Sequence, residues 1–223
     1  MTSDLPSSTE GPRAATTPGD PELLAERIVG QLSQGSRLII GVTGPPGTGK
    51  STLVAAVADV LATRTSVLVV PMDGFHLGQS VIRNTPLETR KGAPDTFDAA
   101  GYALLMQRLR RRSEEVVYAP TYDRSINEPI AASIAVTRDT QVILTEGNYL
   151  LWSDRYWTMA RRAMDEIWYL DTPADLRLDR LFRRHVMFGK SDREAVAWVH
   201  ESDEANARDI AATRHRASLI IQG

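Results

Sequence analysis

The chain of 223 residues contains no cysteine. Disulfide bonds, thiolate metal sites and a cysteine nucleophile are therefore excluded. No stretch approaches the roughly 18 consecutive apolar residues that a membrane-spanning helix needs. The N-terminal residues also lack the apolar segment of a secretory signal peptide. Because these absences fit a reducing compartment, we expect a cytoplasmic protein without a membrane partner.

The charge balance excludes another class of partner. The formal net charge is −2 and the isoelectric point is about 6.1, so there is no basic excess of the kind that binds nucleic acid. Hydrophobic residues make up 42% and charged residues 24%, which is ordinary globular usage. The length suits one α/β domain with its own core. None of these numbers determines the oligomeric state, and both a monomer and a homodimer are compatible with them.

The composition changes near residue 20. Residues 1–20 are rich in Ser, Thr, Pro and Gly and contain few large apolar residues, which predicts a disordered tail. From Pro21 onwards apolar residues recur at helical spacing, and Asp20 is a candidate N-cap. We therefore expect a single folded domain over residues 21–223.

Apolar strands then alternate with amphipathic helices. Strands are expected over residues 37–43, 66–71, 141–145, 166–170 and 219–221, and helices over 50–63, 99–112, 174–187 and 192–212. Strands separated by helices favour a mainly parallel sheet covered on both faces. The polar segment 74–97, punctuated by Gly and Pro, is expected to be a binding loop.

A glycine-rich motif joins the first of these strands to the next helix. It comprises Gly44, Pro45, Pro46, Gly47, Thr48, Gly49, Lys50 and Ser51, followed by Thr52. The spacing G-x-x-x-x-G-K-[ST] is that of a loop whose backbone N–H groups cradle phosphates. Lys50 can reach the β- and γ-phosphates, and the Ser51 hydroxyl can bind Mg²⁺. The motif therefore predicts binding of ATP and Mg²⁺, although a glycine-rich turn with a solvated lysine is the simpler alternative.

Asp73 follows the expected strand over residues 66–71. Ligands of open α/β sheets bind beyond the carboxyl ends of the strands, so this side chain would lie near the γ-phosphate. A carboxylate there can accept the proton of an attacking hydroxyl. The residues alone equally allow a simple Asp73-Gly74 turn.

Four segments, in this order, resemble the phosphoribulokinase/uridine kinase superfamily, which includes the type I pantothenate kinases. They are Gly44–Ser51, Met72–Phe75, Tyr118–Arg124 and Thr145–Asn148. The resemblance covers about residues 22–222. It implies a P-loop NTPase-type three-layer sandwich with a helical lid, an ATP-dependent kinase activity, and Asp73 as the catalytic base.

Glu146 ends another expected strand, where a Walker-B-type acid would lie close to Mg²⁺. The family has I-L-E-G at a place where this chain has Ile143-Leu-Thr-Glu146-Gly, so a residue is inserted or the strand end is shifted. An ordinary strand-capping glutamate is the alternative. We expect Ser51 and Glu146 to be the metal-binding side chains, and Glu146 and Asn148 to border the substrate pocket.

Three arginines lie at positions i, i+3 and i+7 of an expected helix and therefore share one face: Arg177, Arg180 and Arg184. Such a stripe can fold over a triphosphate as a lid, here about residues 177–192, or remain a solvated face paired with acids. The lid of the resembling family aligns with Arg180, Arg184 and Lys190, but His185 replaces its usual aspartate and Lys190 replaces its last arginine. The resemblance implies nucleotide binding by Arg180 and Arg184 and a catalytic role for Arg184.

Further polar and aromatic side chains are expected to meet the acceptor: Asp73 itself, His76, Arg90, Lys91, Tyr122 and Arg124. Residues 91–98 resemble a segment of pantothenate kinases, and residues 120–123 resemble the P-x-Y-D of uridine kinases. Arg124 could bind an anionic group or be a structural partner of Asp123 or Glu128. His76 is either a hydrogen-bond donor in the pocket or a ring that faces the core.

The function expected from these residues is transfer of the γ-phosphoryl of ATP to a hydroxyl of a sugar, nucleoside or pantothenate-like acceptor. One alternative is a uridine or nucleoside kinase proper. An alternative of another class is a regulatory ATP-binding P-loop protein with slow hydrolysis. Asp73 argues against the last alternative, because a base aimed at an acceptor has little use in a regulatory switch.

Overall fold

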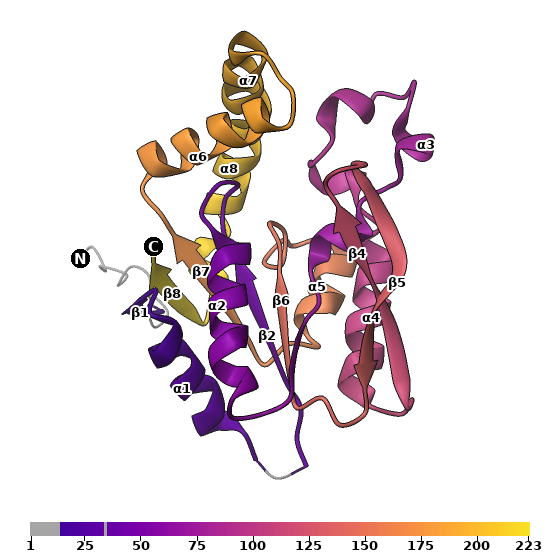
Figure 1. The fold of residues 1–223 in the computed structure, drawn as a ribbon, viewed down its shortest axis with the longest axis vertical. Helices are drawn as coiled ribbons and strands as arrows, with labels where there is room; N and C mark the ends of the chain where they lie inside the picture. The colour runs from indigo at the N-terminus through magenta and orange to yellow at the C-terminus, as the bar shows by residue number, and fades with distance from the viewer. Residues whose placement is uncertain (1–13, 34) are drawn as a thin grey trace, which may run out of the picture.

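The computed structural model describes residues 14–33 and 35–223. Its centre is a six-stranded sheet in the order β1-β8-β7-β2-β6-β3, in which all neighbours are parallel. The strands are β1 (Ala15–Pro18), β2 (Leu38–Thr43), β3 (Val67–Val69), β6 (Val142–Glu146), β7 (Glu166–Asp171) and β8 (Leu219–Gln222). The central strands β2 and β6 are buried throughout. The expected parallel sheet is confirmed (Figure 1).

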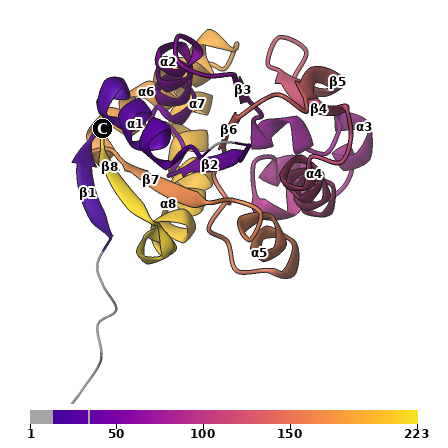
Figure 2. The ribbon, with the colours of Figure 1, turned by 90° about the horizontal axis from the view of Figure 1, so that it is seen from below.

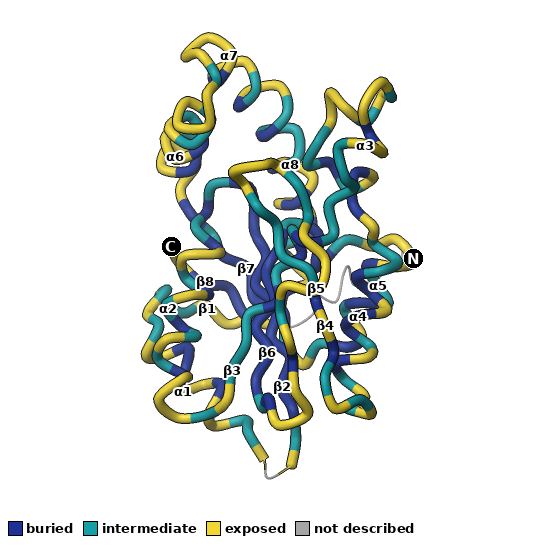
Figure 3. Tube along the Cα trace, turned by 45° about the vertical axis from the view of Figure 1, so that its right-hand side comes forward, coloured by how far each residue is buried: buried dark blue, intermediate teal, exposed yellow. Residues whose placement is uncertain are grey.

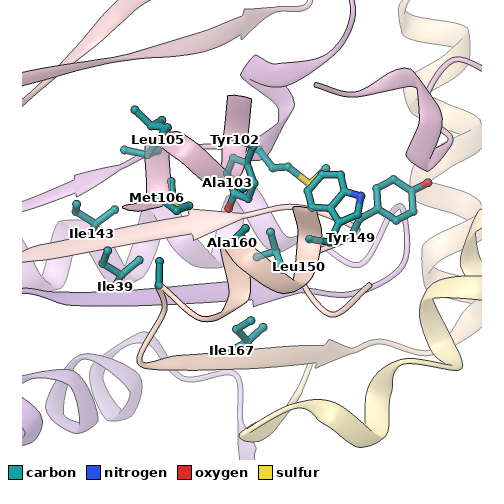
Figure 4. Close-up of a cluster of buried hydrophobic side chains, with 14 of the residues drawn as sticks. Ile39, Tyr102, Ala103, Leu105, Met106, Ile143, Tyr149, Leu150, Ala160 and Ile167 are labelled. Carbon is teal, nitrogen blue, oxygen red and sulfur yellow. The ribbon is translucent and has the colours of Figure 1, made fainter. Parts of the chain in front are cut away.

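Helices cover both faces of this sheet (Figure 2). They are α1 (Pro21–Gln31) and α2 (Lys50–Ala62) on one face, and α4 (Ala99–Arg111), α5 (Arg155–Arg161) and α8 (Glu204–Ala211) on the other. Figure 4 shows the second interface, where Tyr102 and Met106 of α4 and Ala160 of α5 lie over Ile39 and Ile143 of the strands. The three-layer sandwich is therefore confirmed.

Two groups of elements extend beyond the carboxyl ends of the strands (Figure 1). One contains α6 (Ala174–Met187), α7 (Asp192–Trp198) and a π-helical turn (Val199–Asp203), and the other contains α3 (Gln79–Ile82). Figure 3 shows that exposed residues predominate in α6 and α7, in contrast to the buried sheet, whereas α3 contains buried, intermediate and exposed residues. Both groups are thus placed to border a ligand at this edge of the sheet.

A separate antiparallel hairpin pairs β4 (Val116–Asp123) with β5 (Glu128–Thr137). It packs beside α4 and a 3₁₀ turn at Met72–Phe75. The remaining 3₁₀ turns are Glu88–Arg90, Pro94–Thr96 and Arg214–Arg216. The hairpin was not expected from the sequence, although β4 contains Tyr122, one of the residues expected to meet the acceptor.

Two expectations need correction. The tail predicted over residues 1–20 is wrong for Ala15–Pro18, which form β1 along the edge of β8, and Gly19 N also donates to Gln222 O at 2.8 Å. Edge pairing satisfies backbone groups without requiring large apolar side chains, so composition did not reveal it. Residues 1–13 of that tail lie outside the described part of the chain.

The single helix predicted over 192–212 is interrupted by the π-helical turn.

The segment 74–97 also carries more structure than a plain loop. It contains α3 and the 3₁₀ turns at Glu88–Arg90 and Pro94–Thr96. Over the described ranges, no helix has the length and apolarity needed to cross a membrane.

Candidate functional site

The glycine-rich motif forms a tight loop between β2 and α2. Gly47 has a φ of +80°, and a Cβ atom there would lie 2.6 Å from the carbonyl oxygen of Arg177. Only glycine fits both the left-handed backbone and this close approach. Thr48 Oγ1 donates to Pro45 O at 3.0 Å, which closes the loop upon itself. The first turn of α2 follows, with Ser51 and Thr52 exposed.

Lys50 lies inside this loop and is only 8% exposed. Its ammonium group donates to the carbonyl oxygens of Gly44 at 2.8 Å and Pro45 at 3.0 Å. Burial lowers the pKa of Lys50 to about 8, while the nearby charges of Glu146 and Asp73 act in the opposite direction. Burial has removed water from the Lys50 ammonium group, and only carbonyl oxygens contact it. The oxygens of an anionic phosphate would replace the lost water.

Ser51 and Glu146 meet beside Lys50, because β2 and β6 pair in a register that sets Val42 opposite Glu146. Ser51 Oγ donates to Glu146 Oε1 at 3.0 Å. Burial raises the pKa of the Glu146 carboxyl, and the negative charge of Asp73 raises it further. A cation here would relieve that like-charge repulsion.

These oxygen donors fit Mg²⁺. Hydroxyl and carboxylate oxygens are its preferred ligands, and it usually binds through one or two protein groups together with waters and substrate phosphates. The described residues contain no group of three or more His, Cys, Asp or Glu side chains that could form a complete protein cage. Ser51 and Glu146 therefore suit a metal shared with a nucleotide.

Asp73 lies in the 3₁₀ turn after β3 and is paired with Arg124 of the hairpin. Arg124 Nη2 donates to Asp73 Oδ2 at 2.9 Å. The hairpin comes this close because a Cβ on Gly74 would lie 2.6 Å from Pro120 O. Neither Asp123, which accepts hydrogen bonds from Ser125, nor Glu128 is the partner of Arg124, so this expected alternative is wrong.

Two arginines of α6 contact the outer side of the glycine-rich loop, residues 44–49, which is called the phosphate loop below. Arg177 Nη1 donates to Pro46 O at 3.1 Å, and its Nη2 pairs with Glu204 at 2.7 Å. Arg180 Nη1 donates to Thr48 O at 3.1 Å. Arg177, which is 6% exposed, therefore links the loop to α8 rather than reaching over a ligand.

Arg184 differs from these two. It has no hydrogen-bond or ion-pair partner within residues 14–33 and 35–223, yet it is only partly exposed. Burial lowers its pKa, and the positive charge of Arg124 is the next cause, opposed by Asp203 and Asp73. Two guanidinium groups from separate elements thus approach each other around Asp73, an arrangement that an anion would stabilise.

The two departures from the lid pattern of the resembling family make structural contacts. His185 Nε2 lies 2.7 Å from Asp203 Oδ2 in the π-helical turn. Lys190 Nζ lies 4.2 Å from the ring centroid of Trp198 in α7. The first contact connects α6 with the π-helical turn, and the second connects the segment after α6 with α7.

The expected acceptor residues divide into two groups. Tyr122 Oη donates to Asn127 Oδ1 at 2.6 Å, and Lys91 Nζ donates to Asn127 O at 2.9 Å and lies 5.6 Å from the Tyr122 ring centroid. His76 packs against Tyr122 at 4.7 Å between ring centroids. Arg90 instead forms an exposed ion pair with Asp95 at 3.0 Å, away from this cluster of contacts.

Asn148 follows β6, and its backbone carbonyl accepts a hydrogen bond from Thr43 Oγ1 at 3.0 Å. This contact ties the turn after Glu146 to the end of β2. Asn148 therefore lies at the same sheet edge as the phosphate loop, while its side chain is partly exposed.

A cavity of about 470 Å³ opens on the β7 and β8 side of the phosphate loop. Pro45 of the loop, Tyr169 at the end of β7, Arg177 and Glu204 line it together with Gln222 of β8. Glu204 and Gln222 could not be identified from the sequence, because they lie outside the motifs. Asp73 stands on the opposite, β3 side, so the loop separates two places where ligand groups could lie.

Known proteins resemble this chain in sequence over most of its length. Residues 39–223 match the profile of the "Phosphoribulokinase / Uridine kinase family". A provisionally named uridine kinase of Schizosaccharomyces pombe is 30% identical over 208 residues, covering 89% of this chain and 88% of its own. A uridine kinase of Latilactobacillus sakei is 33% identical over 82% of this chain and 84% of its own.

A solved structure extends the comparison to three dimensions. It is a provisionally named fructose transport system kinase from Silicibacter sp. TM1040, 35% identical, with a TM-score of 0.80. It covers 90% of this chain, and 98% of its own length is matched. The similarity therefore extends over nearly the whole of both chains.

Proposed function

This chain belongs to the phosphoribulokinase/uridine kinase family, and we propose that it transfers the γ-phosphoryl group of ATP to one hydroxyl of a sugar, nucleoside or pantothenate-like metabolite. As a member of this family it is a kinase that acts on a hydroxyl-bearing substrate. The proposal of phosphoryl transfer to a hydroxyl rests on the position of Asp73. This residue lies beyond β3 near Lys50 and Glu146 and is paired with Arg124.

The nucleotide would lie along the phosphate loop. Its adenosine part would lie in the cavity of about 470 Å³ on the β7 side, which Pro45 of the loop borders. Its phosphates would take the N–H groups of the loop, the start of α2 and the ammonium group of Lys50. Pro45 touches both the cavity and Lys50, which supports one continuous ligand along this path.

Ser51 and Glu146 would hold Mg²⁺ beside the phosphates, directly or through water. An ion held there would offset the negative charge that develops on the phosphoryl group during transfer. Lys50 and Arg184 supply further positive charge around the γ-phosphate. Because Arg184 has no partner in the described residues, a phosphoryl oxygen can occupy its donors without breaking an existing bond.

Asp73 would accept the proton of the attacking hydroxyl and align its oxygen with the γ-phosphorus. One carboxylate oxygen is held by Arg124, which leaves the other for the acceptor. The names of the similar proteins point to different acceptors, uridine in one and fructose transport in another. The family therefore supports the reaction more strongly than it supports any one substrate.

The test is ADP release by the wild-type protein with ATP and Mg²⁺ across D-fructose, D-ribose, glycerol, uridine and pantothenate, with Lys50→Ala as the blank. We expect at least one acceptor to stimulate ADP release well above the rate without acceptor. Stimulation by uridine alone would establish the nucleoside kinase alternative. ATP hydrolysis that no acceptor changes would contradict the proposal and favour a regulatory ATP-binding protein.

A further inference from the structure

The carboxylate of Asp203 is held by His185, which lies in the last turn of α6. His185 Nε2 is 2.7 Å from Asp203 Oδ2, and the two side chains are only 14% and 10% exposed. An ionised carboxylate accepts hydrogen bonds and cannot donate them, so Nε2 carries the hydrogen of this contact. Because the pair is largely shielded from water, its hydrogen bond is stronger than one on the surface.

The π-helical turn Val199–Asp203 places Asp203 at this contact. A π turn adds about one residue to a helical turn and so rotates each later side chain by roughly 100° relative to a continuous helix. The turn packs against α6, and the next residue, Glu204, pairs with Arg177 near the start of α6 at 2.7 Å. Two consecutive acids therefore hold α6 near both of its ends.

Arg184 precedes His185 in α6 and lies within range of the same carboxylate. Burial and the positive charge of Arg124 lower its pKa, and the negative charges of Asp203 and Asp73 oppose that shift. Over the described ranges no ion pair joins Arg184 to either acid, because Asp203 is held by His185 and Asp73 by Arg124. The Arg184 guanidinium therefore lies between an acid on the side of α6 and an acid on the acceptor side.

The His185 contact decides which partner Arg184 can take. A shielded carboxylate that loses its hydrogen-bond donor gains most by pairing with a nearby cation. An Arg184 paired in this way would no longer offer its donors to a phosphoryl oxygen.

We propose that His185 is a positioning residue. Its hydrogen bond to Asp203 keeps that carboxylate from pairing with Arg184, whose guanidinium then stays available for the transferred phosphoryl group. This inference rests on the proposed function, in which Arg184 acts at the γ-phosphate.

Removal of the imidazole tests the proposal, in the presence of the acceptor that gives the fastest ADP release. His185→Ala should lower kcat by about tenfold, because Asp203 then competes with the phosphoryl group for Arg184, and should leave the acceptor KM within about twofold of wild type. His185→Gln should keep most of the activity, since its amide N–H group can donate to the carboxylate. The control is His200→Gln, which replaces an exposed histidine of the same π-helical turn and should have wild-type kinetics.

A double variant distinguishes positioning from a structural role. When Asp203→Asn is added to His185→Ala, the charge that attracts Arg184 is gone, and kcat should return to within about threefold of wild type. If the contact only held α6 against the π-helical turn, the double variant would be as slow as His185→Ala or slower. That result, or a wild-type kcat in His185→Ala, would overturn the inference. His185→Asn, whose amide is too short to reach Asp203, serves in the same cycle if the alanine variant does not fold.

Nitrogen-15 NMR of the arginine side chains reads the same contact without turnover. The Arg184 signal, assigned by its loss in Arg184→Gln, should report a freely rotating guanidinium in wild type at pH 7.5. The guanidinium should become paired and rotate slowly in His185→Ala, and be free again in the double variant. A guanidinium that stays free in all three proteins would overturn the inference while the kinase activity stands. Wild-type protein that phosphorylates no acceptor refutes the proposed function itself.

Discussion

The two sides of the phosphate loop are built in different ways. On the nucleotide side, the loop is one short segment whose own carbonyls hold Lys50 at 2.8 and 3.0 Å. On the acceptor side, Asp73 and Arg124 come from elements 51 residues apart and meet only through the packing of the hairpin. The comparison teaches that the proposed phosphate site is encoded locally, whereas the proposed acceptor site depends on tertiary structure.

The largest effect should come from the local side. Lys50→Met removes the cation closest to the phosphates and should lower kcat by about 10³-fold. Lys50→Arg should not restore activity, because a planar guanidinium cannot replace a compact ammonium in this enclosed position. Steady-state kinetics with the best acceptor measure the loss, and circular dichroism confirms the fold. Activity within tenfold of wild type would show that the loop does not bind the reacting phosphates.

The next largest effect should come from Arg184, which lies between the two sides of the phosphate loop. Arg184→Gln should lower kcat by about 10²-fold and change the KM for ATP little, because its charge is needed most in the transition state. The control is Arg183→Gln, since Arg183 forms an exposed pair with Asp179 on the same helix and should leave kcat unchanged. Equal losses in kcat and ATP affinity would indicate ground-state binding only.

A smaller effect should come from Arg124, on the side of the loop that depends on tertiary structure. Arg124→Gln should lower kcat by about tenfold, because Asp73 loses the partner that orients its carboxylate. Arg124→Lys should retain part of the activity, since a lysine can still donate to one carboxylate oxygen. The matched control is Arg90→Gln, which removes an exposed arginine paired with Asp95. If Arg124→Gln has wild-type kcat, the ion pair is not needed for catalysis.

The smallest expected effect is on the pH dependence of the free energy of unfolding, and it comes from His76. Its pKa is lowered in the folded protein, so the unfolded chain binds a proton first as the pH falls below about 6.5. The free energy of unfolding should therefore fall below pH 6.5 more steeply in wild type than in His76→Asn. Urea unfolding at pH 7.5 and pH 5.5 measures the difference. Parallel losses in both proteins would show that His76 is not held neutral by the fold.

The same contrast explains what could be predicted from the sequence. The parallel sheet, Ser51 and Glu146 followed from apolar runs and a motif with fixed spacing, so local pattern sufficed. The hairpin was missed because β5 is largely exposed and does not alternate between buried and exposed residues. The partner of Arg124 could not be found either, since no sequence pattern links it to Asp73.

The central claim is that Asp73 serves as the base for the acceptor hydroxyl, and Asp73→Asn tests it most directly. The measurement is phosphoryl transfer to the best acceptor together with ATP affinity, with Asp95→Asn as the control. We predict that transfer falls by about 10²- to 10⁴-fold, while ATP binds as tightly as in wild type. Transfer near the wild-type rate would contradict the account.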